Sequence, residues 1–466
     1  MNNNFWDLEK HGEQIAIFSH DYSPINYSNL AIMADSRTVN LSKGKLFVLE
    51  CSNNLNTVLV YLGALRKGAI PLMVNSSTDK NILNELYEHF EIEDIYDSLN
   101  DIWIEKKPKI NVIFKPHLSL GLLLTTSGST GSPKLVRLSL ENLSSNAISI
   151  ASYLYLDNKE VCITSLPLSY SYGLSILNSH LLVGGKIVLT ENGVTSPLFW
   201  ELFKKFGVTS LSGVPATWRI LRKMRFEKML LPSLKTITQA GGRLEAEEIS
   251  WLNEISKPIS RNVFVMYGQT EATARISYLP IEYIEKKLGS IGRAIPGGSL
   301  SIQDDKGSVL LPGVEGELVY EGPNVMLGYA FDKNDLMLGK NVFMLKTGDL
   351  AKCDEDGFFW ITGRLSRFIK LFGNRFALDD VERYINTLGI ESAVTGDDDC
   401  LMVAIAGSQK DANDLELQLS TRYKVHKSAI KVVVSEIPRN ESGKILYLDL
   451  KNKIKKIIMK ESGNAD

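Results

Sequence analysis

Short apolar runs alternate with amphipathic stretches through the first two thirds of this 466-residue chain. Residues 45–52 read as a buried strand, 55–68 as a helix closed by glycine, and 69–76 as the next strand. This order is typical of βαβ units, whose helices cover the faces of a largely parallel sheet. The alternation recurs at residues 160–168, 185–191, 197–207, 234–242 and 262–268. We therefore predict an α/β fold for this part of the chain.

The pattern changes after Gly289, where short β-like runs punctuated by glycine continue to about residue 361. Strands so closely spaced indicate an antiparallel, barrel-like part. Residues 363–375 are dense in charge and glycine, as a hinge would be, and the rest of the chain mixes helix with strand. Because a chain of this length exceeds one compact core, we predict two domains. The large N-terminal domain would span residues 1–363 and contain the α/β sheets and the barrel-like part, and a small, mobile α+β domain would span residues 364–466.

The composition restricts the kinds of partner and the location. A net charge of -2 gives no reason to expect nucleic acid or an anionic membrane as the main partner. No apolar segment approaches the ~20 residues of a membrane span, and no secretory signal is visible. The four cysteines lie far apart, which fits reduced thiols better than a disulfide framework. We expect a cytoplasmic protein with no integral membrane segment.

A loose polar loop, TTSGSTGSPK, follows a run that reads as a fully buried strand. Its glycines allow backbone N–H groups to approach an anion, its hydroxyls add donors, and its lysine adds a mobile positive charge. The loop is not a P-loop, since Pro133 precedes the lysine and Leu135 follows it. A surface turn is the alternative to a phosphate site. The loop residues that we predict to bind phosphate are Thr125, Thr126, Ser127, Gly128, Ser129, Thr130, Gly131 and Lys134.

Five collinear segments resemble the signatures of the adenylate-forming superfamily, which includes acyl-CoA synthetases, acyl-AMP ligases, peptide-synthetase adenylation domains and luciferases. The segments are TTSGSTGSPK (125–134), YGQTE (267–271), KTGDL (346–350), GRLSRFIKLFGNRFALDDVE (363–382) and NESGKI (440–445). One such match would be weak evidence. Five matches in the expected order extend the resemblance over nearly the whole chain.

The resemblance implies an enzyme that activates a carboxylic acid with Mg·ATP and releases pyrophosphate. The acyl group would then pass from acyl-AMP to a phosphopantetheine thiol, on coenzyme A or on an acyl carrier protein. Thr270 would contact the α-phosphate, and Glu271 would help to hold Mg²⁺. Lys444 would bridge the carboxylate and the α-phosphate. Without the resemblance, Lys444 would read as a solvated surface charge.

The resemblance also implies the remaining contacts with the nucleotide. Asp349 would accept hydrogen bonds from both ribose hydroxyls, as acidic residues do in other nucleotide sites. Arg364 would support the ribose or a phosphate. The adenine would lie flat against a glycine-rich turn with a tyrosine stacked on it. These further predicted nucleotide-binding residues are Gly241, Gly242, Tyr267, Gly268 and Gln269.

The predicted hinge departs from the family pattern at one position. The family has aspartate, sometimes lysine, where this chain has Ser366. A serine can absorb a change in backbone torsion, but the usual hinge chemistry is in doubt. Lys370 and Gly373 match the family, and Gly373 would lie on the loop that forms the thiol tunnel. The C-terminal domain would swing about this hinge after adenylation and admit the thiol.

The acyl pocket is predicted around residues 165–185, where Tyr170 stands in place of a histidine found in acyl-CoA synthetases. Tyr172 and Gly173 would complete this side of the pocket. An equal alternative is that Tyr170 and Tyr172 are core residues at the start of a helix, with their hydroxyls hydrogen-bonded. Trp218 would limit the length of the pocket, or it is plain core. The segment has no acidic side chain, and a buried ammonium without a partner would be costly. An α-amino acid substrate is therefore disfavoured.

Two rival functions remain open at this point. A non-catalytic member would bind the nucleotide as a sensor or scaffold, but it would need neither Lys444 nor Glu271. A second rival would form acyl-AMP without making a thioester. The basic, amphipathic residues 451–460 read as a last helix with a solvated face, and docking of an acidic carrier protein or a membrane surface there is a minority alternative.

Overall fold

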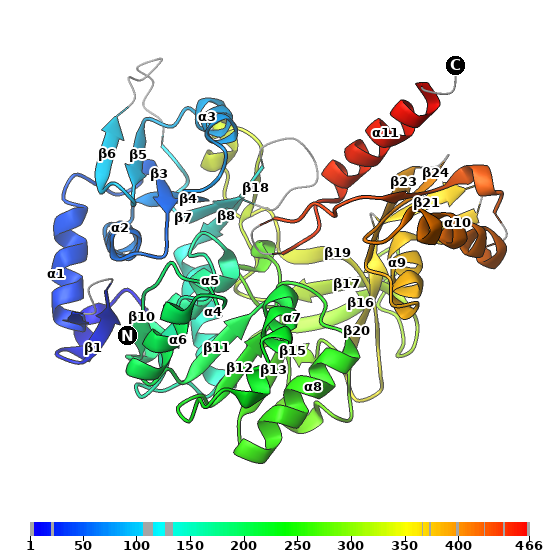
Figure 1. Ribbon diagram of the computed structural model, residues 1–466. Coiled ribbons are helices and arrows are strands. Elements are labelled where there is room, and N and C mark those ends of the chain that lie inside the picture. The colour runs from blue at the N-terminus through cyan, green and yellow to red at the C-terminus, as the bar shows by residue number, and fades with distance from the viewer. Residues whose placement is uncertain are drawn as a thin grey trace. The chain divides into compact units, whose positions relative to one another are not determined.

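The computed structural model describes residues 4–19, 23–105, 115–125, 134–365, 367–371, 374–397, 400–423, 425–440 and 443–463 (Figure 1). The chain divides into two compact units. Of the described residues, those up to 300 and residues 319–345 make the first unit, and residues 301–318 and those from 346 onward make the second. The predicted α/β class is confirmed. The boundary that we place at residue 363 stays a prediction.

A nine-stranded sheet forms the larger part of the first unit. Its central strands pair in parallel, as the βαβ alternation predicts, and antiparallel strands close both edges. In spatial order the strands are β15 (Arg293–Ala294), β14 (Ser277–Leu279), β13 (Asn262–Tyr267), β12 (Thr236–Gln239), β11 (Ser210–Gly213), β9 (Val161–Ile163), β10 (Lys186–Val188), β1 (Ile15–Phe18) and β2 (Pro24–Asn26). Its helices are α4 (Leu140–Tyr153), α5 (Ser171–Val183), α6 (Pro197–Lys205), α7 (Pro215–Lys223) and α8 (Ala246–Ser256).

A second sheet of the same unit has seven strands. In spatial order they are β18 (Gly328–Ala330), β8 (Leu135–Ser139), β7 (Leu120–Thr125), β4 (Ile70–Asn75), β3 (Leu46–Cys51), β5 (Asp94–Asp97) and β6 (Ile102–Glu105). The helices of this part are α1 (Tyr27–Arg37), α2 (Leu55–Lys67) and α3 (Lys80–His89). Strands β3, β4, β5 and β7 are parallel neighbours, and β8 returns antiparallel to β7.

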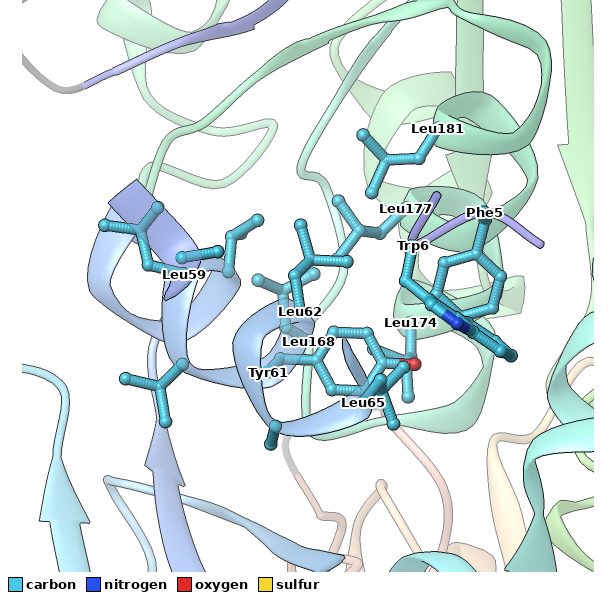
Figure 2. Packing of buried hydrophobic residues seen from close by; sticks show 14 of the residues in the cluster. Phe5, Trp6, Leu59, Tyr61, Leu62, Leu65, Leu168, Leu174, Leu177 and Leu181 are labelled. Carbon is cyan, nitrogen blue, oxygen red and sulfur yellow. The ribbon is translucent and has the colours of Figure 1, made fainter. Parts of the chain in front are cut away.

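Helix α2 is the central element of the largest hydrophobic core. Asn54 caps its N-terminus by accepting from the Thr57 N–H, and Gly68 ends it with a φ of 68°, where glycine is favoured. The helix is apolar around most of its circumference, so it is buried on all sides. Its Tyr61 and Leu62 lie among leucines of α5, as Figure 2 shows. This packing joins the parts of the chain that carry the two sheets.

The second unit contains most of a four-stranded sheet, where closely spaced strands predicted the barrel-like part, and a smaller α+β portion. The four strands are β16 (Ser299–Gln303), β17 (Gly316–Glu321), β19 (Met344–Cys353) and β20 (Phe359–Arg364). The α+β portion contains β21 (Phe368–Leu371), β22 (Asn374–Ala377), α9 (Leu378–Thr387), β23 (Ser392–Asp397), β24 (Cys400–Ile405), α10 (Gln409–Tyr423), β25 (Ile430–Val434) and α11 (Tyr447–Gly463). Strands β23, β24 and β25 form one sheet.

Seven short 3₁₀ helices are found within the described ranges. They are η1 (Leu8–His11), η2 (Phe226–Lys228), η3 (Lys257–Ile259), η4 (Thr270–Ala272), η5 (Ile281–Tyr283), η6 (Lys333–Met337) and η7 (Lys427–Ala429). Of these, η4 is important for the site, because it directly follows the central strand β13. No helix in the described parts of the chain combines the length and the apolar composition of a membrane span.

Candidate active site

The turn η4 brings together residues that are far apart in the sequence. The Tyr329 hydroxyl donates to Glu271 Oε1 at 2.8 Å, and the Met326 N–H donates to the Glu271 carbonyl at 2.9 Å. On the same turn, Thr270 Oγ1 lies 3.4 Å from the Ser171 hydroxyl at the start of α5. The two residues that we predict to contact the α-phosphate and Mg²⁺ therefore lie on one turn, held by β18 and α5.

Lys134 lies beside the same tyrosine. Its Nζ is 4.2 Å from the centroid of the Tyr329 ring, whose hydroxyl binds Glu271. Tyr329 thus contacts a cation through its ring face and a carboxylate through its hydroxyl, an arrangement that holds both charges near η4. Thr125 is the exposed last residue of β7 and pairs with Leu135. The other predicted phosphate-binding residues, Thr126, Ser127, Gly128, Ser129, Thr130 and Gly131, lie outside the described residues.

Gly241, in the glycine-rich turn after β12, and Gly268, directly after β13, lie too close to a neighbouring group for any residue with a Cβ. Gly241 has a φ of 81°, and a Cβ there would lie 2.4 Å from the Tyr170 hydroxyl oxygen. The Gly242 carbonyl accepts from Gln239 Nε2 at 2.7 Å, which fixes the turn. A Cβ on Gly268 would lie 1.8 Å from the Ala274 carbonyl oxygen, so only glycine fits there. The predicted adenine turn and the predicted acyl pocket therefore adjoin at Tyr170.

Tyr267 and Gln269 flank Gly268 at the end of β13. Gln269 Nε2 donates to the Tyr267 hydroxyl at 3.4 Å. Both residues are partly exposed. Their role in binding adenine stays a prediction.

The remaining acyl-pocket candidates are tightly packed. The buried Tyr172 hydroxyl donates to the Thr238 carbonyl at 2.8 Å, and Trp218 is fully buried against Gly213. A Cβ on Gly173 would lie 2.2 Å from the Pro167 carbonyl oxygen. Burial raises the pKa of Tyr170 to about 12, so its hydroxyl is a neutral donor at physiological pH. Tyr172 and Trp218 make core contacts, and Tyr170 has the more open position.

Asp349 is a buried carboxylate on β19. The residue is 4% exposed, and its Oδ1 accepts from Arg364 Nε at 2.9 Å, across the β19–β20 pair. The Thr347 hydroxyl accepts from the Asp349 N–H and donates to the Leu318 carbonyl, so the strand holds this carboxylate firmly. Two predicted nucleotide contacts, Asp349 and Arg364, are therefore brought together.

Replacing Asp349 with alanine should weaken ATP binding by about 2–3 kcal/mol, the value of a charge-assisted pair of hydrogen bonds. The Arg364 side chain is 49% exposed, so water can solvate its charge in the variant and the fold should persist. Titration calorimetry with ATP measures the change. Asp305→Ala, at an exposed aspartate of a surface turn, is the matched control. Unchanged ATP affinity in Asp349→Ala would contradict the predicted ribose contact.

Lys444 is exposed on a tight turn in the second unit. The Asn440 N–H donates to the Lys444 carbonyl, and the Lys444 N–H donates to Asn440 Oδ1, both at 2.9 Å. Gly443 precedes it with a φ of 77°, which favours glycine. The backbone of Lys444 is thus fixed by Asn440, and the residue is exposed.

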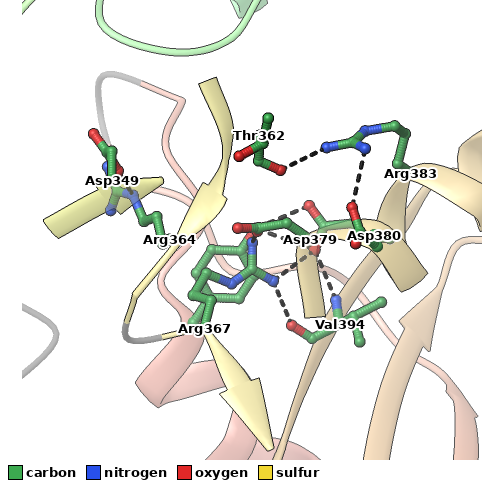
Figure 3. Close-up of polar contacts among 10 residues, drawn as sticks. Asp349, Thr362, Arg364, Arg367, Asp379, Asp380, Arg383 and Val394 are labelled. Carbon is green, nitrogen blue, oxygen red and sulfur yellow. Dashed lines mark hydrogen bonds and ion pairs between the residues drawn. The ribbon is translucent and has the colours of Figure 1, made fainter. Parts of the chain in front are cut away.

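A polar network follows the predicted hinge (Figure 3). Arg367 binds Asp379, Glu382 Oε2 at 3.0 Å and the Val394 carbonyl at 2.7 Å. Its guanidinium lies 3.7 Å from the centroid of the Tyr447 ring, and the Tyr447 hydroxyl donates to Glu382 Oε1 at 2.9 Å. Because Tyr447 comes three residues after Lys444, this network fixes the lysine turn to the strand that follows the hinge.

Of the three predicted hinge residues, Ser366 and Gly373 lie outside the described residues. Lys370 belongs to β21, where only its backbone is described. Sequence reasoning also missed Tyr329, Arg367 and Tyr447 as parts of the site. Arg367 lies within the quoted segment 363–382, so its position beside the hinge was the available signal. Nothing in the sequence points to Tyr329.

The residues around η4 fit Mg·ATP. The described residues contain no group of three or more His, Cys, Asp or Glu side chains suited to hold a metal ion. Mg²⁺ is commonly bound through one or two carboxylates together with substrate phosphates, and Glu271 can supply that carboxylate. The turn at Gly241 leaves no room for a Cβ beside Tyr170, as expected where the backbone must approach a flat base.

Comparison with known proteins gives a consistent result. Residues 98–330 match the family model described as AMP-binding enzyme. The chain is 26% identical to the 2-succinylbenzoate–CoA ligase of Bacillus cytotoxicus, over 95% of each chain. It is 29% identical to the indoleacetate–CoA ligase of Aromatoleum aromaticum, over 71% of this chain and 66% of the relative.

A solved structure shows the same fold. The O-succinylbenzoate coenzyme A synthetase of Bacillus subtilis, in complex with ATP and magnesium ion, aligns with a TM-score of 0.76 and 22% identity. The alignment covers 96% of this chain and 99% of that chain. Fold and sequence thus define an enzyme that activates a carboxylic acid as its adenylate. The chain belongs to the AMP-binding enzyme family. It is an AMP-forming acid–thiol ligase.

Proposed function

We propose that the residues of η4 and its neighbours bind Mg·ATP and the acid, and that Asp349 and Lys444 complete the adenylation site. The observation that carries this proposal is the contact of Lys134 and Glu271 with opposite parts of Tyr329, beside Thr270. A cation, a carboxylate and a hydroxyl close to one another are the groups needed to neutralise phosphates and to hold Mg²⁺.

In the proposed reaction a carboxylate oxygen attacks the α-phosphorus, and the bond to the β-phosphate oxygen breaks. Mg²⁺, when bound, neutralises charge on the phosphate oxygens. Lys134 and Thr270 would donate to phosphate oxygens, and Glu271 would fix the metal. Lys444 would offset the negative charge of the two anions as they meet. A thiolate then attacks the acyl carbonyl, and AMP leaves.

Coenzyme A is the proposed acceptor, since the relatives are named as CoA ligases. An acyl carrier protein is the second acceptor that the chemistry allows. The relatives' printed names include 2-succinylbenzoate and indoleacetate, both aryl acids, so an aryl or acyl acid is proposed here. We further propose a cytoplasmic location, which the four free thiols of this chain support.

An acid panel tests the proposal in two stages. ATP–pyrophosphate exchange that depends on an added carboxylic acid would support adenylation. Thioester formation is then measured with coenzyme A and, separately, with a phosphopantetheine-loaded carrier protein. Exchange without any thioester would favour the rival that stops at acyl-AMP. ATP binding with no exchange across a broad panel would favour a non-catalytic binder.

A further inference from the structure

Arg275 is a buried cation four residues after Glu271. The residue is 3% exposed, and its backbone carbonyl accepts from the side-chain amides of Asn146 at 3.3 Å and Asn324 at 2.8 Å. These two hydrogen bonds fix the backbone position of Arg275. No carboxylate forms an ion pair with Arg275 in the part of the chain that the structure describes. Within the same part, its Nε has no hydrogen-bond partner.

A buried cation without a counter-ion is costly. Interaction with an aromatic face offsets part of that cost, and Arg275 lies 3.9 Å from the centroid of the Tyr172 ring. The ring cannot accept the in-plane hydrogen bonds of a guanidinium, so the donor at Nε stays unsatisfied. A buried polar group without a partner calls for an explanation, and an acceptor from outside the chain, such as an anion, is one that fits a guanidinium.

Arg275 lies over Tyr172, one of the residues that the sequence predicts for the acyl pocket. Tyr172 follows Ser171, whose hydroxyl contacts Thr270, and Tyr172 lies 6.2 Å from Tyr170, measured between ring centroids. Burial raises the pKa of Tyr170 and Tyr172, and the charge of Arg275 opposes this rise in both. The positive charge of Arg275 therefore acts on both of these predicted acyl-pocket tyrosines.

We infer that Arg275 is a specificity-determining residue, and that the acid substrate carries a second anionic group, of the carboxylate class, that pairs with this guanidinium. This inference rests on the proposed function. The carboxylate that reacts would lie by Thr270, and the second one would lie at the distal end of the acid. A guanidinium suits this task because it binds a carboxylate through two parallel hydrogen bonds.

Matched acids test the inference in the full-length enzyme. The panel contains aliphatic and aryl dicarboxylic acids, from glutarate to terephthalate, each paired with its half-amide and with the monoacid of equal length. For the accepted chain length, kcat/KM in acid-dependent pyrophosphate exchange should be at least about tenfold higher for the diacid than for its half-amide, because a desolvated charge pair is lost. Equal use of diacid and half-amide would overturn the inference and leave the proposed function intact.

Variants separate recognition from a purely structural role. Arg275→Gln should abolish the preference for the diacid through a higher KM, whereas Arg275→Lys should keep part of it, because the positive charge remains. Arg293→Gln is the matched control, since Arg293 also lies over a tyrosine, Tyr283, but is exposed. If Arg275→Gln keeps the wild-type ratio, Arg275 is a packing residue. If Arg275→Gln fails to fold, the ratio of kcat/KM for diacid and half-amide is compared between Arg275→Lys and the wild type, and this comparison decides. If no acid of the panel supports exchange, the proposed function itself is overturned.

Discussion

Lys444→Ala should lower acid-dependent ATP–pyrophosphate exchange by about 10²–10³-fold, the loss typical of removing one donor that stabilises developing charge. The physical reason is that two anions must meet, and the predicted bridging cation would be gone. Lys444 is exposed and its backbone is fixed by Asn440, so the fold should not depend on its side chain. Thioester formation from supplied acyl-AMP should be spared, because that half-reaction does not need the bridge.

Lys427→Ala is the control for this prediction. Lys427 is another exposed lysine of the second unit, and it pairs with Glu416 at 3.6 Å. Its removal should leave both half-reactions unchanged. Full exchange activity in Lys444→Ala would show that Lys444 has no part in adenylation, and loss of both half-reactions would indicate a structural defect instead.

Arg367→Met should destabilise the α+β portion of the second unit by about 3–5 kcal/mol, the usual cost of removing one partner from a buried ion pair. The Arg367 side chain is 13% exposed, and the partly buried Asp379 and Glu382 would lose their cation. Hydrogen–deuterium exchange of peptides from α9 and α11 measures the free energy of opening of these helices. Protection unchanged from wild type would contradict the network's role.

The pH dependence of Arg367→Met gives a second readout. Burial raises the pKa of Asp379 above its ordinary value, and the charge of Arg367 opposes that rise. Without the arginine the pKa should rise further, so the folded variant binds a proton more readily than the unfolded chain. The loss of stability caused by Arg367→Met should therefore be largest at neutral pH and become smaller as the pH falls toward about 5.

Arg383→Met provides the matched control. Arg383 also lies beside α9, where it binds Asp380 and the Thr362 carbonyl, each at 3.0 Å, but its side chain is 41% exposed. Exposed pairs contribute about 0–1 kcal/mol, so the opening free energy of α9 should change little. A similar loss of opening free energy in Arg367→Met and Arg383→Met would show that the burial of an arginine does not determine how much it stabilises α9.

The local pattern of the sequence predicts the parallel elements well. The strand, helix and strand expected over residues 45–76 correspond to β3, α2 and β4, because a continuous apolar run and a terminal glycine specify each element locally. The apolar run at residues 262–268 likewise corresponds to strand β13, which Thr270 and Glu271 follow.

Contacts between distant residues could not be predicted in this way. Tyr329 is 58 residues from Glu271 in the chain, and Tyr447 is 65 residues from Glu382. Neither tyrosine belongs to a motif, and the partner that each one reaches depends on the pairing of β18 with β8 and on the packing of α11. Such pairing is set by the whole core, so no short segment encodes it. Arg275 was missed for the same reason, since burial without a counter-ion is visible only in three dimensions.

The contact of Tyr170 with the turn at Gly241 has a consequence for the order of events. One aromatic residue borders both the predicted base-binding turn and the predicted acyl pocket, and its hydroxyl lies so close to Gly241 that a Cβ there would be 2.4 Å from it. Any shift of this ring that admits one ligand alters the space left for the other. The affinities for nucleotide and acid are then thermodynamically linked, and each ligand must change the dissociation constant of the other by the same factor.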